Sequence, residues 1–278
     1  MGAPEELVHW KKANLEALRS MSFHTSQIRD VTVVAYHYRR TPEELDKSFW
    51  TTEFAFLQTF KTQGILPSVL VLNESTPPIE RFCKRFSVEI QIAKNLIPGT
   101  IRSLALDLVE NLYARFKTPY VLTIQDDGFP LRPGLEEFVG KWDYVGAPWF
   151  HHGLSYHSLY PHKYSVGNGG FSLRSKRLCE TASRIYKKWF RHLPYCSLIC
   201  GDDTFYCKTL RFWFRGAVRG MKWPSPDEAT AFSIEHDDGT QPPKPPLGFH
   251  SFGFMKYQRL FPDIISSMGI IDNAIAVT

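Results

Sequence analysis

Runs of strand-forming residues alternate with helical segments over the first 124 residues of the chain. The pattern predicts strands at residues 30–38, 68–73, 88–93 and 120–124, separated by helices. The first strand is almost continuously apolar from Val31 to Ala35, as expected for a strand covered on both faces. Strands and helices that alternate at this spacing are most simply explained by a parallel sheet. The sequence therefore predicts an α/β domain with a mainly parallel central sheet.

Composition and charge restrict the class of protein. The 278 residues are 43% hydrophobic, enough for one large α/β domain or two small ones. The net charge of +5 suits a phosphate-bearing substrate or an anionic surface, but it is too small and too evenly spread to indicate nucleic acid. Five cysteines without a CxxC pair argue against a disulfide framework or a zinc site. No apolar run reaches membrane-spanning length and the N-terminus is charged, so we expect a cytoplasmic protein, compatible with peripheral membrane contact.

Several common nucleotide-binding motifs are absent. No GxGxxG follows the first predicted strand, which argues against a dinucleotide-binding domain. No GxxxxGK[ST] occurs, which excludes a P-loop. The acidic pair after the fourth strand also lacks the Asp-x-Asp-x-Thr spacing of haloacid-dehalogenase-like phosphatases.

Three polar clusters lie at predicted turns. Gln125-Asp126-Asp127 ends the fourth strand, where α/β proteins bind ligands, and paired carboxylates suit a hard cation with its phosphates. Asn168-Gly169-Gly170 opens a later strand, where glycines let a ligand approach the backbone. Asp202-Asp203 precedes a helix and could supply a general base. Each cluster also has a purely structural explanation: solvated acids for the first, a tight hairpin for the second and helix capping for the third. The residues alone leave both kinds of explanation open.

Two histidine-containing segments complete the set of candidates. His250 follows a Pro-rich segment and lies between Gly248 and Gly253, a position that suits a site role at least as well as a core role. Residues 150–164 hold four histidines among tyrosines, a spacing that fits an aromatic loop over a site better than a tetrahedral metal centre.

The chain resembles the GT-A type of nucleotide-sugar glycosyltransferase. More narrowly, it resembles a family of bacterial and algal glycosyltransferases known only as a domain of unknown function. The motifs that carry the resemblance run from about Val31 to His250; besides the acidic turn and GFH at residues 248–250, they are DYVGAPW (143–149), VGNGGFSLR (166–174) and GDD (201–203). The resemblance implies one GT-A-like, Rossmann-like domain with a mixed, mostly parallel sheet. Its expected bounds are residues 29–262, after a helical extension at 1–28 and before a tail at 263–278.

The same resemblance implies a set of site residues. Asp127 and His250 are the expected ligands of Mn²⁺ or Mg²⁺, although Gln125 replaces the first carboxylate of the family's Asp-x-Asp. Asp203 is the expected catalytic base, with Asp202 as the second choice, which implies inversion at the anomeric carbon. The expected contacts of the donor nucleotide are Ala35, Tyr36, His37, Lys94, Arg102, Gln125 and Asp126. The expected contacts of the sugar or acceptor are Trp149, Asn168, Gly169 and Gly170.

The predicted function is transfer of a sugar from a nucleotide-diphosphate donor to a glycan or lipid-linked acceptor, in surface polysaccharide synthesis. Two alternatives remain: a glycan-binding module without catalysis, and a nucleotidyl- or phosphoryltransferase. The sequence leaves the donor sugar, the nucleotide, the acceptor, the linkage and the oligomeric state open.

Overall fold

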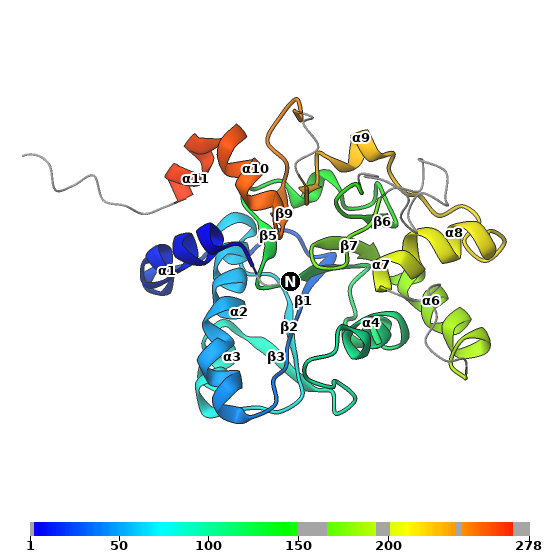
Figure 1. Ribbon diagram of the computed structural model, residues 1–278, viewed down its shortest axis with the longest axis horizontal. Helices are drawn as coiled ribbons and strands as arrows, with labels where there is room; N and C mark the ends of the chain where they lie inside the picture. The colour runs from blue at the N-terminus through cyan, green and yellow to red at the C-terminus, as the bar shows by residue number, and fades with distance from the viewer. Residues whose placement is uncertain (1–2, 150–165, 193–200, 237–240, 269–278) are drawn as a thin grey trace, which may run out of the picture.

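The computed structural model describes residues 3–149, 166–192, 201–236 and 241–268 (Figure 1). The strands within these residues are β1 (Val31–His37), β2 (Ser68–Leu72), β3 (Val88–Ile92), β4 (Tyr120–Ile124), β5 (Gly128–Pro130), β6 (Tyr144–Val145), β7 (Ser172–Ser175), β8 (Ser233–Ile234) and β9 (Gly248–His250). The α-helices are α1 (Glu5–Ser20), α2 (Pro42–Gln63), α3 (Pro77–Phe86), α4 (Ile101–Glu110), α5 (Leu112–Arg115), α6 (Lys176–Trp189), α7 (Asp202–Thr204), α8 (Leu210–Trp213), α9 (Pro226–Ala229), α10 (Gly253–Leu260) and α11 (Pro262–Met268). A 3₁₀ turn covers Leu135–Glu137, and a π-helical turn, Phe205–Thr209, joins α7 to α8.

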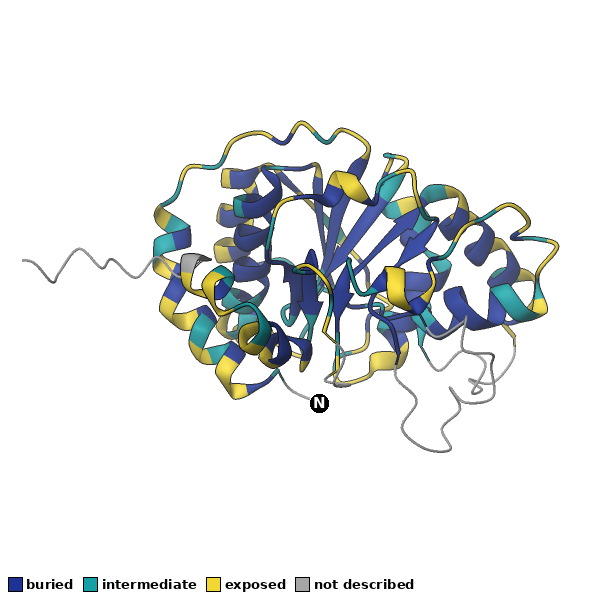
Figure 2. Cartoon of the chain, turned by 90° about the horizontal axis from the view of Figure 1, so that it is seen from above, coloured by how far each residue is buried: buried dark blue, intermediate teal, exposed yellow. Residues whose placement is uncertain are grey.

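The main sheet has six strands in the order β3-β2-β1-β4-β7-β6. The first four pair in parallel, and β7 pairs antiparallel with both β4 and β6. Helices cover the sheet on both sides, and its strands are mostly buried (Figure 2). The prediction of an α/β fold with a mixed, mostly parallel sheet is therefore confirmed.

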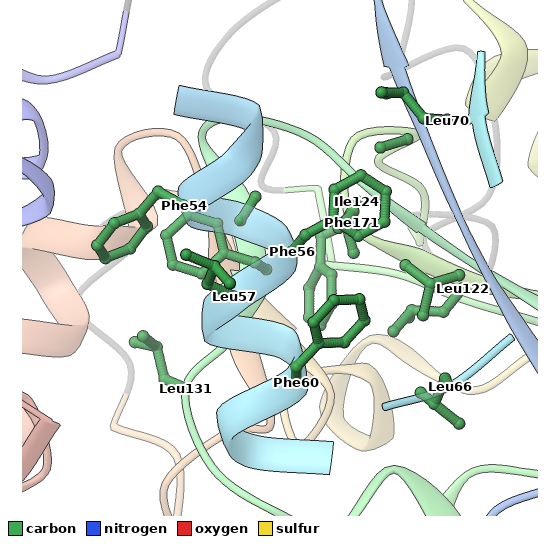
Figure 3. Close-up of a cluster of buried hydrophobic side chains, with 14 of the residues drawn as sticks. Phe54, Phe56, Leu57, Phe60, Leu66, Leu70, Leu122, Ile124, Leu131 and Phe171 are labelled. Atoms are coloured by element: carbon green, nitrogen blue, oxygen red, sulfur yellow. The ribbon is translucent and has the colours of Figure 1, made fainter. Parts of the chain in front are cut away.

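Helix α2 supplies much of the core on one face of this sheet. Thr41 caps it by accepting a hydrogen bond from the Glu44 amide at 3.2 Å, and proline occupies its first position. It ends at Gly64, whose φ of +75° suits a residue without a Cβ. In between, Phe56 and Phe60 point from α2 into the cluster that contains Leu122 and Ile124 of β4 (Figure 3).

The N-terminal helix α1 packs on the same core. The ring of Trp10 lies 5.3 Å from the ring centroids of both Phe54 on α2 and Phe254 on α10. The predicted N-terminal extension thus shares a hydrophobic cluster with the domain. Lys11, the next residue of α1, is also buried.

A second, three-stranded sheet has the order β5-β9-β8 and was not foreseen from the sequence. It places His250 opposite Gly128 in an antiparallel pair. Of the DYVGAPW motif, only Tyr144–Val145 forms a strand, β6, and the chain then becomes irregular. There Gly146 lies so close to the carbonyl of Gly167 that no Cβ would fit. No helix in the described residues is long and apolar enough to cross a bilayer.

Candidate functional site

The acidic turn Gln125–Asp127 joins β4 of the main sheet to β5 of the second sheet. Two backbone hydrogen bonds between Gln125 and Gly128, of 2.9 and 3.1 Å, make the turn tight. The Lys11 ammonium donates to the Asp126 carbonyl at 2.6 Å and is 1% exposed. Burial lowers the pKa of Lys11, while the nearby Asp126 and Asp127 carboxylates oppose that shift. A buried cation from α1 therefore supports the turn, a contribution that nothing in the sequence of α1 indicates.

His250 connects this turn to two other parts of the chain. Its Nε2 lies 3.4 Å from Asp127 Oδ1, and its Nδ1 lies 3.3 Å from Glu235 Oε1. The Asn168 amide nitrogen lies 2.7 Å from the same Nδ1. Burial disfavours a charged ring, but the two carboxylates raise the pKa of His250 to about 10. The two acids on either side of the ring therefore favour its protonated form.

The glycines of the Asn168-Gly169-Gly170 segment make room for protein side chains. A Cβ on Gly169 would lie 2.5 Å from the Asp202 carboxylate, and one on Gly170 would overlap the His250 ring. Asn168 has a φ of +72°, and its side-chain oxygen accepts a hydrogen bond from the Gly170 amide at 2.9 Å. The segment thus brings β7 against His250 and Asp202. Protein side chains lie close to both glycines, and the expected contacts with the sugar or acceptor stay a prediction.

Asp202, the second choice for a base, forms a buried ion pair. Its Oδ2 lies 2.5 Å from Nη2 of Arg174, a side chain with no exposed surface. The Arg174 guanidinium also lies over the rings of Tyr144 and Tyr206, at 5.3 and 4.7 Å from their centroids. A carboxylate held in this way stabilises an arginine, and we assign it a structural role.

Asp203 has a different environment. Its two oxygens accept hydrogen bonds from the backbone amides of Asn168 (3.2 Å) and Thr204 (2.6 Å). Burial, then the charges of Asp202 and Glu235, raise the pKa of Asp203 to about 6. A carboxylate whose pKa lies near neutral pH is suited to accept a proton from a hydroxyl group.

A pocket of about 520 Å³ opens at the carboxyl ends of β1 and β4, next to the acidic turn. Its two basic side chains are Arg39 and Arg40, which follow the first predicted strand and were not among the predicted site residues. Arg39 Nη1 donates to the carbonyl of Tyr38 at 2.8 Å. In the described part of the chain, the Arg40 guanidinium has no hydrogen bond or ion pair. Both arginines thus keep donors for an anionic ligand.

The predicted donor contacts fall into two groups. Tyr36, His37, Gln125 and Asp126 line the pocket. Ala35, Lys94 and Arg102 do not line it: Ala35 is fully buried, and the other two are exposed on the turn after β3 and on α4.

The His37 ring is engaged in the core. Its two ring nitrogens lie 3.0 Å from the Leu45 carbonyl and from the Thr52 hydroxyl. Burial lowers the pKa of His37 to about 4, so the ring is neutral at pH 7. His37 therefore adds no positive charge to the pocket.

Trp149 does not offer the open ring that stacking on a sugar requires. Only 7% of the residue is exposed, its ring packs on Gly167, and Lys208 Nζ lies 4.5 Å from the ring centroid. The neighbouring histidine-rich segment, residues 150–164, lies outside the described residues, so its role stays a prediction.

The described residues do not match the expected metal centre. Among them, no three or more His, Cys, Asp or Glu side chains form a group that could hold a metal ion. Asp127 and His250 are brought together, but they pair with each other, and both ring nitrogens of His250 face carboxylates. A further neighbour of the ring is the neutral Gln125, whose Oε1 lies 3.4 Å from His250 Nε2. We therefore assign no chemical step to a metal ion.

The family model described as a protein of unknown function (DUF5672) matches residues 85–250. The chain belongs to this family. The match agrees with the expected membership of a family described only as a domain of unknown function, and residues 85–250 include the positions of the motifs quoted for it. A search of curated proteins found no match.

Two solved structures of the mannosyltransferase Ktr4p from S. cerevisiae are similar to the chain at 10% identity. One aligns over 68% of this chain and 56% of Ktr4p with a TM-score of 0.34. The other, a complex with GDP, aligns over 81% and 75% with a TM-score of 0.40. In the first alignment the chain spans just over half of Ktr4p. Similarity at this level does not establish a shared activity, so the functional argument rests on the site.

Proposed function

We propose that this protein is a glycosyltransferase that moves a sugar from a nucleotide-diphosphate donor to a hydroxyl of a glycan or lipid-linked acceptor, in surface polysaccharide synthesis. The observation that carries the proposal is a juxtaposition. Gln125 and Asp126 belong both to the acidic turn and to the lining of the pocket that contains Arg39 and Arg40. Gln125 in turn lies next to His250, and Asn168 contacts both His250 and Asp203.

The pocket suits the donor because its arginines can bind the diphosphate. Guanidinium groups form paired hydrogen bonds with phosphate oxygens, and these bonds strengthen as the leaving nucleotide gains negative charge. Tyr36 provides an aromatic wall, and its hydroxyl is held by Asp107 Oδ2 at 2.9 Å. The ring is therefore fixed in one orientation beside the bound nucleotide.

The carboxylate of Asp203 is the proposed base. Its backbone hydrogen bonds fix its orientation, and its pKa of about 6 leaves it mostly ionised at pH 7 while keeping it basic. It takes the proton of the acceptor hydroxyl as the oxygen attacks the anomeric carbon and the nucleotide diphosphate leaves. A single displacement of this kind inverts the anomeric configuration.

Calorimetry with a panel of nucleotide sugars, with and without Mn²⁺, tests the donor, and product analysis tests transfer. With the donor identified, Asp203→Asn should lower turnover by about 10²–10⁴-fold while leaving donor affinity nearly unchanged. Asp227→Asn is the matched control, since Asp227 is an exposed aspartate on α9. Wild-type turnover in Asp203→Asn would refute the assignment of the base. Sugar binding without any transfer would instead indicate a glycan-binding module.

A further inference from the structure

An exposed apolar turn lies at the mouth of the donor pocket. Seven large hydrophobic residues of the described chain are strongly exposed, and three of them lie between residues 92 and 101. These are Ile92, Ile97 and Ile101, with exposed fractions of 46%, 59% and 77%. Ile101 also lines the pocket, as do residues 98–100. The turn, residues 92–102, projects below α4 in Figure 1.

Hydrogen bonds within the turn hold these isoleucines in exposed positions. The Thr100 amide donates to the Ile97 carbonyl at 3.3 Å, across a Pro-Gly pair in which Gly99 has a φ of +80°. The Ser103 hydroxyl accepts from the Ile97 amide at 2.9 Å and lies 3.1 Å from the Ile97 carbonyl. Leu96, only 3% exposed, anchors the turn in the core. The turn thus holds Ile97 and Ile101 in solvent, an arrangement that adds nothing to folding stability.

The charge around this turn is positive. Residues 92–102 contain Lys94 and Arg102 and no acid, and both basic side chains are exposed. Arg40 lies against the turn, because a Cβ on Gly99 would be 3.4 Å from its Nη2. Exposed aliphatic side chains with basic neighbours are typical of surfaces that enter the interface of an anionic bilayer. Surfaces that bind a protein partner more often contain aromatic side chains that fit into a closed groove.

We propose that residues 92–102 dock the protein on a bilayer that carries anionic lipids, with the pocket mouth toward the membrane. The isoleucines enter the apolar part of the interface, and Lys94 and Arg102 meet the acidic headgroups. This orientation has a consequence for the acceptor, which rests on the proposed function. The acceptor is lipid-linked, because the reacting hydroxyl must reach the pocket from the membrane side.

Sedimentation of the full chain with vesicles tests the docking. Vesicles of phosphatidylglycerol and phosphatidylcholine should bind the protein in a salt-sensitive manner, and pure phosphatidylcholine should bind it much less. Ile97→Ser should lower partitioning about tenfold, and Lys94→Gln should lower it about fivefold at low salt. Met255→Ser, which removes an exposed side chain (44%) on α10, should bind like the wild type. All three variants should keep the wild-type melting temperature, because each replaces an exposed side chain.

Wild-type partitioning of Ile97→Ser, or no binding of the wild type to anionic vesicles, would overturn the docking proposal. So would an equal loss in Trp189→Ser, since Trp189 is 57% exposed at the end of α6 and is not part of residues 92–102. Donor calorimetry without vesicles is an independent measurement. Donor binding without vesicle binding overturns the docking alone, while vesicle binding without donor binding overturns the proposed function and, with it, the lipid-linked acceptor.

Discussion

Asp202 and Asp203 are adjacent in the chain, and the structure implies opposite changes in stability when each is replaced by asparagine. Asp202 compensates the charge of Arg174, which has no exposed surface, through a contact of 2.5 Å. Asp203 instead bears an ionised carboxylate in a site that disfavours it, as shown by its raised pKa of about 6. The first substitution leaves a buried charge unpaired, and the second removes an unfavourable one.

The magnitudes follow from these environments. Removing one partner of a buried ion pair costs about 3–5 kcal/mol, so Asp202→Asn should be strongly destabilising. For Asp203, a pKa raised from 3.8 to about 6 corresponds to about 3 kcal/mol of unfavourable free energy at pH 7.5. Asparagine retains one oxygen for the two backbone donors, which offsets about 1 kcal/mol of the gain. A net stabilisation of about 2 kcal/mol remains.

The effect of Asp203→Asn should depend on pH. Above pH 6 the Asp203 carboxylate is ionised in both the folded and the unfolded protein, so the wild type bears the full penalty. As the pH falls through about 6, the folded state takes up a proton before the unfolded state does. The penalty is lost between pH 6 and pH 3.8, and the advantage of the variant should shrink over that interval.

Differential scanning calorimetry at pH 7.5 and at pH 5 measures both effects. For a chain of 278 residues the unfolding entropy is about 0.6 kcal/mol/K. Asp202→Asn should therefore lower the melting temperature by about 5–8 °C, and Asp203→Asn should raise it by about 3 °C at pH 7.5. Asp227→Asn should change it by less than about 1 °C. Shifts of the same sign for the two neighbours would refute the assignment of distinct roles.

Two further substitutions test the geometry around the acidic turn. Gly170→Ala should displace His250 and abolish most transfer, because the added Cβ would overlap the His250 ring. Gly216→Ala is the control and should leave turnover unchanged in the same assay, because a Cβ there meets nothing within 4 Å. Lys11→Met should weaken donor affinity about tenfold in calorimetry, because two aspartate charges beside the pocket lose their buried cation. Lys12→Met, an exposed neighbour on α1, should bind donor normally, and an equal loss there would contradict the role of Lys11.

The main sheet was predictable because local signals agree with it. The apolar runs that form β1, β2 and β4 are bounded by turn residues, and α2 begins at Thr41-Pro42, a capping residue followed by a residue that favours the first helical position. The short strands were less predictable. The pair of β5 with β9 joins residues more than a hundred positions apart, and three-residue strands have little periodicity of their own.

The difference between local and long-range signals also explains which site residues were predicted. Asp127, Asp203 and His250 are acids or a histidine at turns, so residue type and position suggested them. The sequence ranked Asp203 before Asp202 as the base but gave no physical reason for the difference, because it depends on Arg174 of β7. Lys11 could not be found at all, since a lysine on an amphipathic helix normally faces solvent and this one is buried by packing on α2.

The most unusual position in the acidic turn, Gln125, fits the charges that surround it. Lys11 lies beside Asp126 and Asp127, and the imidazolium of His250 pairs with Asp127 and Glu235. A carboxylate at position 125 would add another acid 3.4 Å from a ring that already has two. The neutral amide avoids that repulsion and lets its oxygen face the positively charged ring. The turn is thus organised around cations that the protein supplies, and the arginines beside it complete a surface suited to a diphosphate.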